Sequence, residues 1–371
     1  MPTASSTDLH RIVNLLRAHP LVGSDCTDNV YELDEILGEG GFGIAFLGVE
    51  RNSERRVCVK LTTDQDSWHR EAYFGSLLRG NSRVIQMLES FPYHAQIGRH
   101  GFPSFVLVFE YAENGSLGDY LEKKGPWPED RARREIAALL KVMTELHAGG
   151  AMHRDITPMN VLVTKAGNLK LNDFGIAQQE LPGKAVPADV FNWGFVSHIK
   201  QQAGRRHWLT SDDVFQMGQL LGIVLRGDPS ELLGARQIKK LNCSDELKAI
   251  ISKAVGPRKE RFETAYEMLL ALEGQDVEQP AIRTLKNKRV VFTGPLSVRR
   301  EDAAMLVAQV GGTVQGEVRG NTDVVVVGQR SKLYRHKMKG KKIKTAQELN
   351  RSGSKIRFIN EPQFLRLVRY R

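Results

Sequence analysis

Cysteine is scarce in this sequence, and long apolar runs are missing. Only 3 of 371 residues are cysteine (Cys26, Cys58 and Cys243), and they lie far apart with no CxxC pair. This spacing argues against a disulfide framework or a zinc site and favours a reducing compartment. The chain opens without a basic cluster followed by an apolar run, and no apolar stretch is long enough to span a membrane. We therefore expect a soluble protein, cytoplasmic, or nuclear if the source is eukaryotic.

Charge is divided unevenly along the chain. The whole sequence has a formal net charge of +10, but residues 283–371 carry 21 Lys and Arg against 6 Asp and Glu, a net charge of +15. The first 282 residues hold 32 basic and 37 acidic residues, so they are slightly acidic. Such asymmetry indicates a separate C-terminal domain with an anionic partner. A hydrophobic content of 41% favours packed cores, and the length allows two or three domains.

Four short motifs follow one another between residues 38 and 175. They are the glycine loop GEGGFG at 38–43, an apolar run that ends in Lys60, HRDITPMN at 153–160 and DFG at 173–175. Glycines let a backbone approach phosphates without a side-chain clash, a lysine neutralises phosphate charge, and carboxylate and amide oxygens suit Mg²⁺. Each motif alone is also common in turns or strand ends. Their order and spacing together predict a site that binds ATP and transfers its γ-phosphoryl group to a hydroxyl.

This ordered set resembles the protein kinase family over residues 31–272. The resemblance implies an α+β bilobal protein kinase fold, ATP and Mg²⁺ as cofactors, and a protein substrate. It implies that Lys60 pairs with the α- and β-phosphates and that Glu71, on a helix beginning near residue 66, holds Lys60 through an ion pair. Asp155 then accepts or orients the proton of the substrate hydroxyl, while Asn160 and Asp173 hold Mg²⁺.

The same resemblance implies further contacts around the nucleotide. The backbone of the glycine loop, at Gly38, Gly40 and Gly43, surrounds the triphosphate. Phe42 lies at the tip of the loop. A hinge between the lobes hydrogen-bonds adenine through the backbone of Glu110 and Ala112. The adenine ring is sandwiched between Cys58 and Leu162.

Several positions depart from the family pattern or support it only in part. Gly75 replaces a bulky apolar residue one turn after Glu71, which predicts a loosely held helix. Thr157 stands where kinases acting on serine and threonine usually have a lysine. No Ala-Pro-Glu-like stop follows the DFG motif, and Ser197 is the only hydroxyl between residues 175 and 210, which makes switching by loop phosphorylation doubtful. Asp213 resembles the aspartate that braces the catalytic loop, whereas Arg261 resembles a late family arginine without its usual glutamate.

The C-terminal segment has its own pattern of strands and helices. Strands are expected at 288–294, 323–328 and 355–359, with helices at 299–310, 345–350 and 361–368. The continuously apolar run at 323–328 suggests a buried parallel strand. The order of elements and the FTG, RED, GG and TD motifs resemble the BRCT domain, a small α/β domain with a parallel four-stranded sheet.

Domains of this type bind DNA, phosphoserine peptides or each other. Thr293, Gly294 and Lys342 match the positions that hold phosphate in such domains, and a helix N-terminus beside a cation is a sound anion site. A basic run of seven Lys or Arg residues surrounds this site at 332–344. We expect contact with the DNA backbone, with a phosphoprotein ligand or a structural role as alternatives.

The expected organisation has four parts. A helical extension covers residues 1–29, with a helix at 8–19 that packs on the small lobe or recruits a partner. The kinase domain spans 30–273, a linker 274–283 and the BRCT domain 284–371. The predicted function is a serine/threonine kinase, as Pro158 indicates, localised or activated through the basic domain. The alternatives are an ATP-binding pseudokinase scaffold and a small-molecule phosphotransferase.

Overall fold

The structure is a computed structural model that describes residues 6–24, 27–40, 43–97, 100–179, 208–274, 282, 284–328 and 341–368. These residues form two compact units, and each is described by itself. The first unit comprises the chain up to residue 139 together with 155–177 and 223–232, and the second unit comprises the rest. Phe42, Ser197 and most of the basic run at 332–344 lie outside the described residues.

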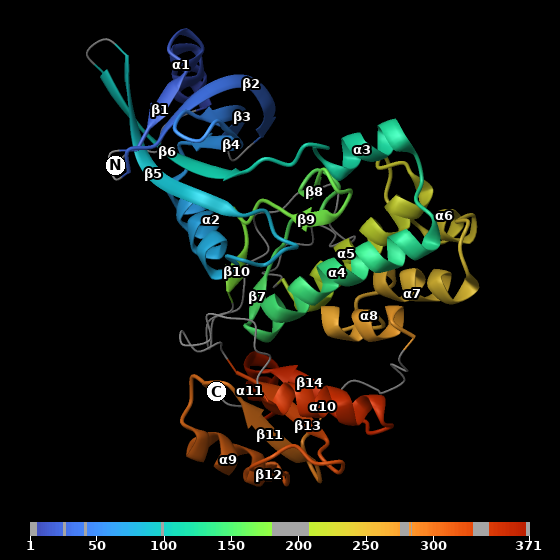
Figure 1. Cartoon of the computed structure of the whole chain (residues 1–371). Coiled ribbons are helices and arrows are strands. Elements are labelled where there is room, and N and C mark those ends of the chain that lie inside the picture. Colours follow the sequence, from blue (N-terminus) through green and yellow to red (C-terminus); the bar gives the residue numbers. More distant parts are fainter. Residues whose placement is uncertain are drawn as a thin grey trace. The chain divides into compact units, whose positions relative to one another are not determined.

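The first unit contains a six-stranded antiparallel sheet with the order β1-β2-β3-β4-β6-β5 (Figure 1). Its strands are β1 (Leu21–Gly23), β2 (Val30–Gly40), β3 (Gly43–Glu50), β4 (Arg55–Thr62), β5 (Met87–Ile97) and β6 (His100–Glu110). In β4, Val57, Val59 and Leu61 are buried in the core, while the alternate residues Cys58 and Lys60 face the other side of the sheet. The apolar run that ends in Lys60 is therefore a strand.

The first residues of the chain belong to this sheet. Helix α1 (Ser6–Ala18) buries Ile12, Val13 and Leu16 in the same core cluster as β2, β3, β4 and β6. The helix predicted at 8–19 is therefore present, and it packs on the small sheet. Strand β1 was not predicted: it pairs antiparallel with β2 and extends the sheet to a sixth strand.

The packing of α1 gives a stability prediction. Replacing Ile12, which is fully buried, with alanine should lower the free energy of unfolding by about 2–5 kcal/mol, because the deletion leaves a cavity in the core. Urea unfolding followed by circular dichroism would measure the loss. The exposed Arg17 lies on the same helix, and Arg17→Ala serves as the control with an expected change within about 0.5 kcal/mol. Equal stabilities for the two variants would contradict a core role for α1.

Between residues 117 and 272, helices dominate. They are α3 (Leu117–Lys124), α4 (Glu129–Ala148), α5 (Thr210–Arg226), α6 (Ala235–Lys239), α7 (Asp245–Val255) and α8 (Ala265–Leu272). Two small antiparallel ladders accompany them: β7 (Ala151–Met152) with β10 (Gln178–Gln179), and β8 (Val161–Val163) with β9 (Leu169–Leu171). A strand-rich part followed by a helical part is what the sequence predicted.

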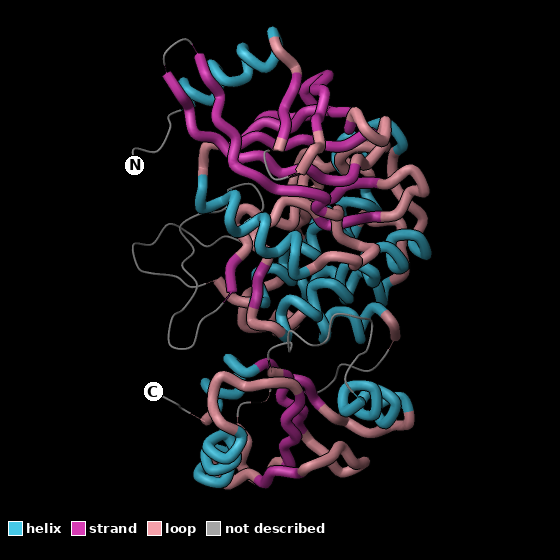
Figure 2. The backbone as a smooth tube through the Cα atoms, turned by 60° about the vertical axis from the view of Figure 1, so that its left-hand side comes forward, coloured by secondary structure: helices cyan, strands magenta, loops and turns pink. Residues whose placement is uncertain are grey.

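The C-terminal segment forms a separate four-stranded sheet in which every neighbouring pair is parallel, with the order β12-β11-β13-β14. Its strands are β11 (Arg289–Thr293), β12 (Thr313–Gln315), β13 (Val324–Val327) and β14 (Arg357–Asn360). Helices α9 (Arg300–Gln309) and α11 (Glu361–Leu367) pack on one face, and α10 (Lys341–Arg351) packs on the other (Figure 2). A parallel four-stranded sheet is present as predicted, and β12 is the strand that the sequence did not locate.

Candidate active site

The glycine loop is formed by the end of β2 and the start of β3, where Gly40 pairs with Gly43. Gly43 has a φ of +137°, and a Cβ there would lie 2.3 Å from the carbonyl oxygen of Leu61, so only glycine fits. A Cβ on Gly38 or Gly40 would meet nothing within 4 Å. The backbone on that side is therefore open to a ligand such as a triphosphate.

Three charged side chains meet behind this loop. Lys60 donates from Nζ to Oε2 of Glu71 at 2.8 Å and to Oδ1 of Asp173 at 3.2 Å. Burial alone would lower the pKa of Lys60, but the carboxylates of Asp173 and Glu71 raise it above its ordinary value, so the ammonium stays charged. The sequence predicted the pairing of Lys60 with Glu71, and the structure adds Asp173 to it.

Helix α2 (Gln65–Leu77) carries Glu71 and has defined contacts at both ends. Asp64 caps its N-terminus by accepting hydrogen bonds from two backbone amides of the first turn. At the other end, a Cβ on Gly75 would lie 2.9 Å from both Cβ and Sδ of Met87. The methionine on β5 thus packs directly against Gly75. The expectation of a loosely held helix stays a prediction.

Asp155 and Asn160 form the second half of the site. Asn160 donates from Nδ2 to Oδ2 of Asp155 at 2.6 Å and to its backbone carbonyl at 3.1 Å, which leaves the amide oxygen as a potential metal ligand. Burial, reinforced by the charge of Asp173, raises the pKa of Asp155 to about 7, while Asn160 and Lys60 oppose the rise. A carboxylate poised near neutral pH is suited to accept a proton.

Thr157 takes a structural part in the same loop. It is 1% exposed, and its Oγ1 accepts a hydrogen bond from the backbone amide of Asn160 at 3.2 Å. A side chain buried in this way does not replace the lysine that the family places there for the γ-phosphate. Thr157 instead fixes the turn that presents Asn160.

Residues predicted around adenine share one apolar cluster. Ala112 is buried in it, and Cys58 and Leu162 pack against it together. The carboxylate of Glu110 accepts hydrogen bonds from Nζ of Lys170 at 2.6 Å and from the backbone amide of Gln86 at 2.8 Å. The side chain of Glu110 is thereby turned to the protein, and its backbone amide donates to the carbonyl of Gln86 at 2.9 Å.

In the second unit, Asp213 fixes the residues that immediately precede Asp155. Its carboxylate accepts hydrogen bonds from the backbone amides of His153 at 2.8 Å and Arg154 at 3.0 Å, as the sequence predicted. It also accepts from Nε1 of Trp208 at 2.9 Å and lies 3.1 Å from Nε2 of His147. Burial alone would raise the pKa of Asp213, but these donors, led by His147, lower it, so the carboxylate remains ionised.

Two of these partners were missed from sequence. Nδ1 of His147 accepts a hydrogen bond from the backbone amide of Ala265 at 3.2 Å, so its Nε2 carries the proton and donates to Asp213. Trp208 precedes Asp213 by five residues without a motif around it. The only indication in the sequence was its residue type, because tryptophan is usually buried, as Trp208 is here.

Arg261 has a partner that the sequence did not reveal. Its NH1 lies 3.4 Å from Oδ1 of Asp212, Arg258 binds the other oxygen of the same carboxylate, and Nε of Arg261 donates to the carbonyl of Gly256 at 2.7 Å. Asp212 on α5 therefore takes the place of the glutamate that was expected and absent. It satisfies a guanidinium group that is almost fully buried.

The predicted anion site lies at the end of β11. Lys342, in the first turn of α10, donates from Nζ to the carbonyl of Phe292 at 3.2 Å, next to the buried Thr293. Arg300, the first residue of the RED motif, was not predicted at this site and donates to the carbonyl of Gly294 at 3.0 Å. Burial, followed by the charge of Arg300, lowers the pKa of Lys342. Two cations thus converge on one turn of the C-terminal sheet.

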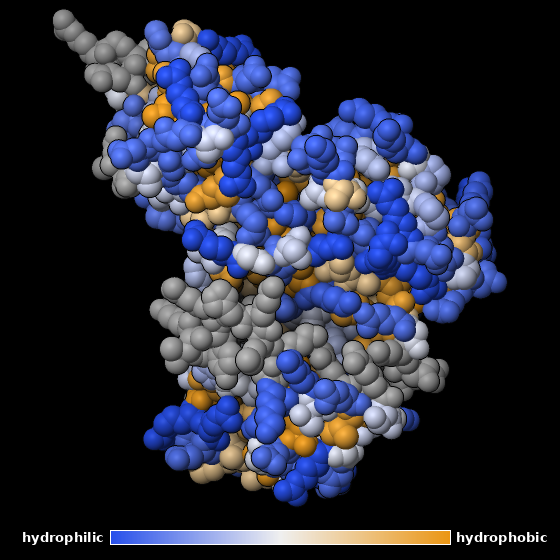
Figure 3. Space-filling model, viewed as in Figure 1, coloured by the Kyte–Doolittle hydropathy of each residue, from blue (hydrophilic) through white to orange (hydrophobic). Residues whose placement is uncertain are grey.

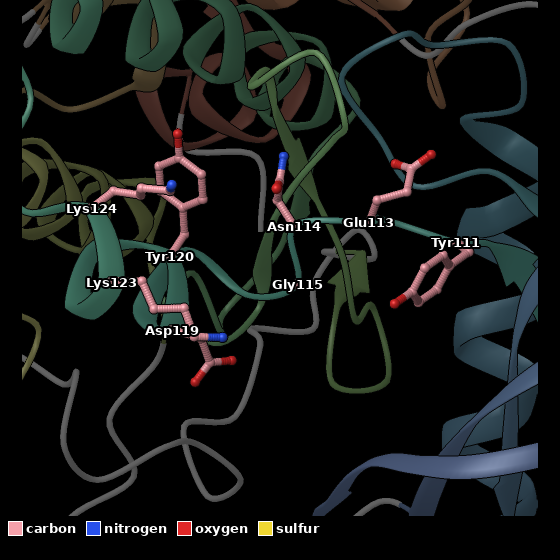
Figure 4. A pocket seen from close by; sticks show the side chains of 8 residues that line it. All are labelled: Tyr111, Glu113, Asn114, Gly115, Asp119, Tyr120, Lys123 and Lys124. Carbon is pink, nitrogen blue, oxygen red and sulfur yellow. The ribbon is translucent and has the colours of Figure 1, made fainter.

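A separate pocket of about 270 Å³ borders the hinge and α3 (Figure 4). It is lined by Tyr111, Glu113, Asn114, Gly115, Asp119, Tyr120, Lys123 and Lys124. None of the residues predicted to hold ATP is among them, but Tyr111 lies between Glu110 and Ala112, so the pocket adjoins the predicted adenine contacts.

On the face drawn in Figure 3, hydrophilic residues cover most of the described surface. Within the described ranges, no helix combines the length and apolarity needed to span a membrane. Nor does this part of the chain gather three or more His, Cys, Asp or Glu side chains around a possible metal. Asn160 and Asp173 fit Mg²⁺, which binds one or two protein ligands together with phosphates and waters.

Comparisons with known proteins bear on the same region. A family model described as "Protein kinase domain" matches residues 31–289, more than half of the chain. The serine/threonine-protein kinase PknB of Mycobacterium leprae is 26% identical over 306 residues, which cover 74% of this chain and 48% of that protein. The serine/threonine-protein kinase PEPKR2 of Arabidopsis thaliana is 29% identical over 201 residues, covering 54% and 40%. The chain thus spans less than half the length of these relatives.

Proposed function

This chain belongs to the protein kinase family, and we propose that it is a serine/threonine kinase that transfers the γ-phosphoryl group of ATP to protein hydroxyls. One observation carries the proposal: the first unit joins Lys60, Glu71 and Asp173 in a charged network and pairs Asp155 with Asn160. Each of these residue types has a task in phosphoryl transfer, which depends on positioning and charge neutralisation.

We assign the roles as follows. Lys60, kept charged by two carboxylates, orients the α- and β-phosphates, and the open backbone at Gly38 and Gly40 covers them. Asn160 and Asp173 would hold Mg²⁺, which would neutralise phosphate charge, while ATP supplies the phosphoryl group. Asp155 orients the acceptor hydroxyl and takes its proton. Adenine lies between Cys58 and Leu162 and bonds to the backbone of Glu110 and Ala112.

The test is transfer of labelled γ-phosphate from ATP in the presence of Mg²⁺, with phosphoamino-acid analysis of the product. Phosphoserine or phosphothreonine on protein substrates would support the proposal. Phosphorylation of aminoglycosides or sugars in place of proteins would support the small-molecule alternative. ATP binding that depends on Lys60 without any transfer would favour the pseudokinase scaffold.

For the C-terminal segment we propose a BRCT-like domain at 284–371, joined to a kinase domain at 30–273 by the linker 274–283. Its parallel sheet supports this, together with the turn at Gly294, where φ is +76°. Because Lys342 and Arg300 both reach this turn and the segment carries +15, we propose that it binds the phosphate backbone of DNA.

Charge reversal tests this binding. We expect Arg300→Glu with Lys342→Glu to weaken binding of a nicked duplex with a 5′-phosphate about tenfold or more, because two phosphate contacts are lost. Fluorescence anisotropy over a range of salt concentrations would measure the affinity and its salt dependence. Lys286→Glu, at an exposed position of the same segment, is the control. A preference for a phosphoserine peptide over the duplex would reject DNA as the ligand.

A further inference from the structure

One face of α2 is directed at the DFG segment. Ser67, Arg70, Glu71 and Phe74 have the spacing i, i+3, i+4 and i+7, which places them on one side of a helix. Ser67, Glu71 and Phe74 are buried. Glu71 reaches Asp173 through Lys60, and the ring of Phe74 stacks on Phe174 with a centroid distance of 5.8 Å.

Arg70 makes the remaining contact of this face. It donates from Nε to the backbone carbonyl of Gly175 at 2.6 Å, a short hydrogen bond assisted by the guanidinium charge. The amide of Gly175 in turn donates to Oδ1 of Asp173 at 3.1 Å, the oxygen that also accepts from Lys60. A continuous chain of hydrogen bonds therefore runs from Arg70 through Gly175 to the carboxylate of Asp173.

The approach between helix and segment is close enough to require the glycine. A Cβ on Gly175 would lie 2.6 Å from Oγ of Ser67 and 3.1 Å from Oδ1 of Asp173. Ser67 is 1% exposed, so its side chain has no room to withdraw into solvent. Gly175 is thus fitted against α2, and its carbonyl is held where Arg70 reaches it.

Ser197 is the only hydroxyl between residues 175 and 210, so phosphorylation has a single possible position there. We propose that Arg70 is a positioning residue whose hydrogen bond to Gly175 fixes Asp173 for metal binding without loop phosphorylation. This inference rests on the proposed kinase function. It identifies the hydrogen bond of Arg70 as the contact that positions the metal-binding carboxylate of Asp173.

The first test measures nucleotide binding, so it does not depend on catalysis. Calorimetry with a non-hydrolysable ATP analogue, with and without Mg²⁺, gives the gain in affinity due to the metal. For Arg70→Ala we expect this gain to fall about 10- to 100-fold, the effect of one hydrogen bond to a charged group, with metal-free affinity unchanged. Arg70→Lys should recover part of the gain, because an ammonium can also donate to the carbonyl. Arg79→Ala, at an exposed position just after α2, should match the wild type.

The second test uses phosphotransfer by phosphatase-treated protein. Arg70→Ala should lower kcat and raise the Mg²⁺ concentration needed for half the maximal rate, with the KM for the peptide unchanged. An unchanged metal-dependent affinity in Arg70→Ala would overturn the inference, even if its melting temperature falls. If the wild type binds the analogue but transfers no phosphate, the kinase proposal fails while the binding data still decide the role of Arg70.

Discussion

Asp155→Asn is expected to lower the rate of phosphotransfer by about 10²–10⁴-fold, the range of a lost general base, while ATP affinity stays near that of the wild type. The amide has the shape of the carboxylate and still offers an oxygen to Nδ2 of Asn160, which now donates to Asp155 at 2.6 Å. It cannot take the proton of a substrate hydroxyl. Labelled-ATP transfer and nucleotide titration, done on the same preparations, would separate the two effects.

The control for this substitution is Asp130→Asn, at an exposed position in the first turn of α4. It changes the same charge without touching the site, so its rate should equal that of the wild type. If Asp155→Asn transferred phosphate as fast as Asp130→Asn, Asp155 would have no role in proton transfer. The acceptor hydroxyl would then have to be activated by another group.

Asp213→Ala is expected to cost about 3–5 kcal/mol of unfolding free energy, as removal of one member of a buried charged network does. The change leaves the buried amides of His153 and Arg154, Nε1 of Trp208 and Nε2 of His147 without their acceptor. Urea unfolding would measure the loss. Hydrogen exchange of peptides covering residues 147–160 would show whether the loop before Asp155 loses protection.

Two further variants keep this prediction testable if Asp213→Ala does not fold. Trp208→Phe removes one donor and should cost less, about 1–2 kcal/mol, with faster exchange at 153–154. Asp245→Asn changes an aspartate whose side chain is fully exposed, so both measurements should match the wild type. Exchange rates at 153–154 that do not change in Trp208→Phe or Asp213→Ala would show that the loop is fixed by other contacts.

Local motifs predicted much of the site, because each contributes a residue whose type and spacing fit one chemical task. Lys60, Asp155, Asn160 and Asp173 were found this way, and the ion pair of Lys60 with Glu71 followed from the family resemblance. The spacing of apolar residues predicted α1, an apolar run marked β4, and a continuously apolar run together with the family resemblance predicted the parallel C-terminal sheet.

The remaining features depend on contacts between residues distant in sequence. Met87 fills the space beside Gly75, and Asp212 replaces the missing partner of Arg261. Neither pairing is indicated by a motif or a periodic pattern in the sequence, because a side chain of the right size or charge can come from any neighbouring element. The contact of Arg70 with Gly175 is harder still to predict, since its acceptor is a backbone carbonyl that every residue type possesses.

The short β1 strand has a consequence for how copies of this protein meet one another. A strand at the edge of a sheet exposes unpaired backbone groups, to which a strand of another chain can add. Beside the 11-residue β2, β1 occupies the outer position with only three residues, so it presents few such groups. A protein shortened to begin at residue 30 would expose the edge of β2 and the apolar core under α1. Strand β1 and helix α1 thus cover the edge and the core that such a shortened protein would expose.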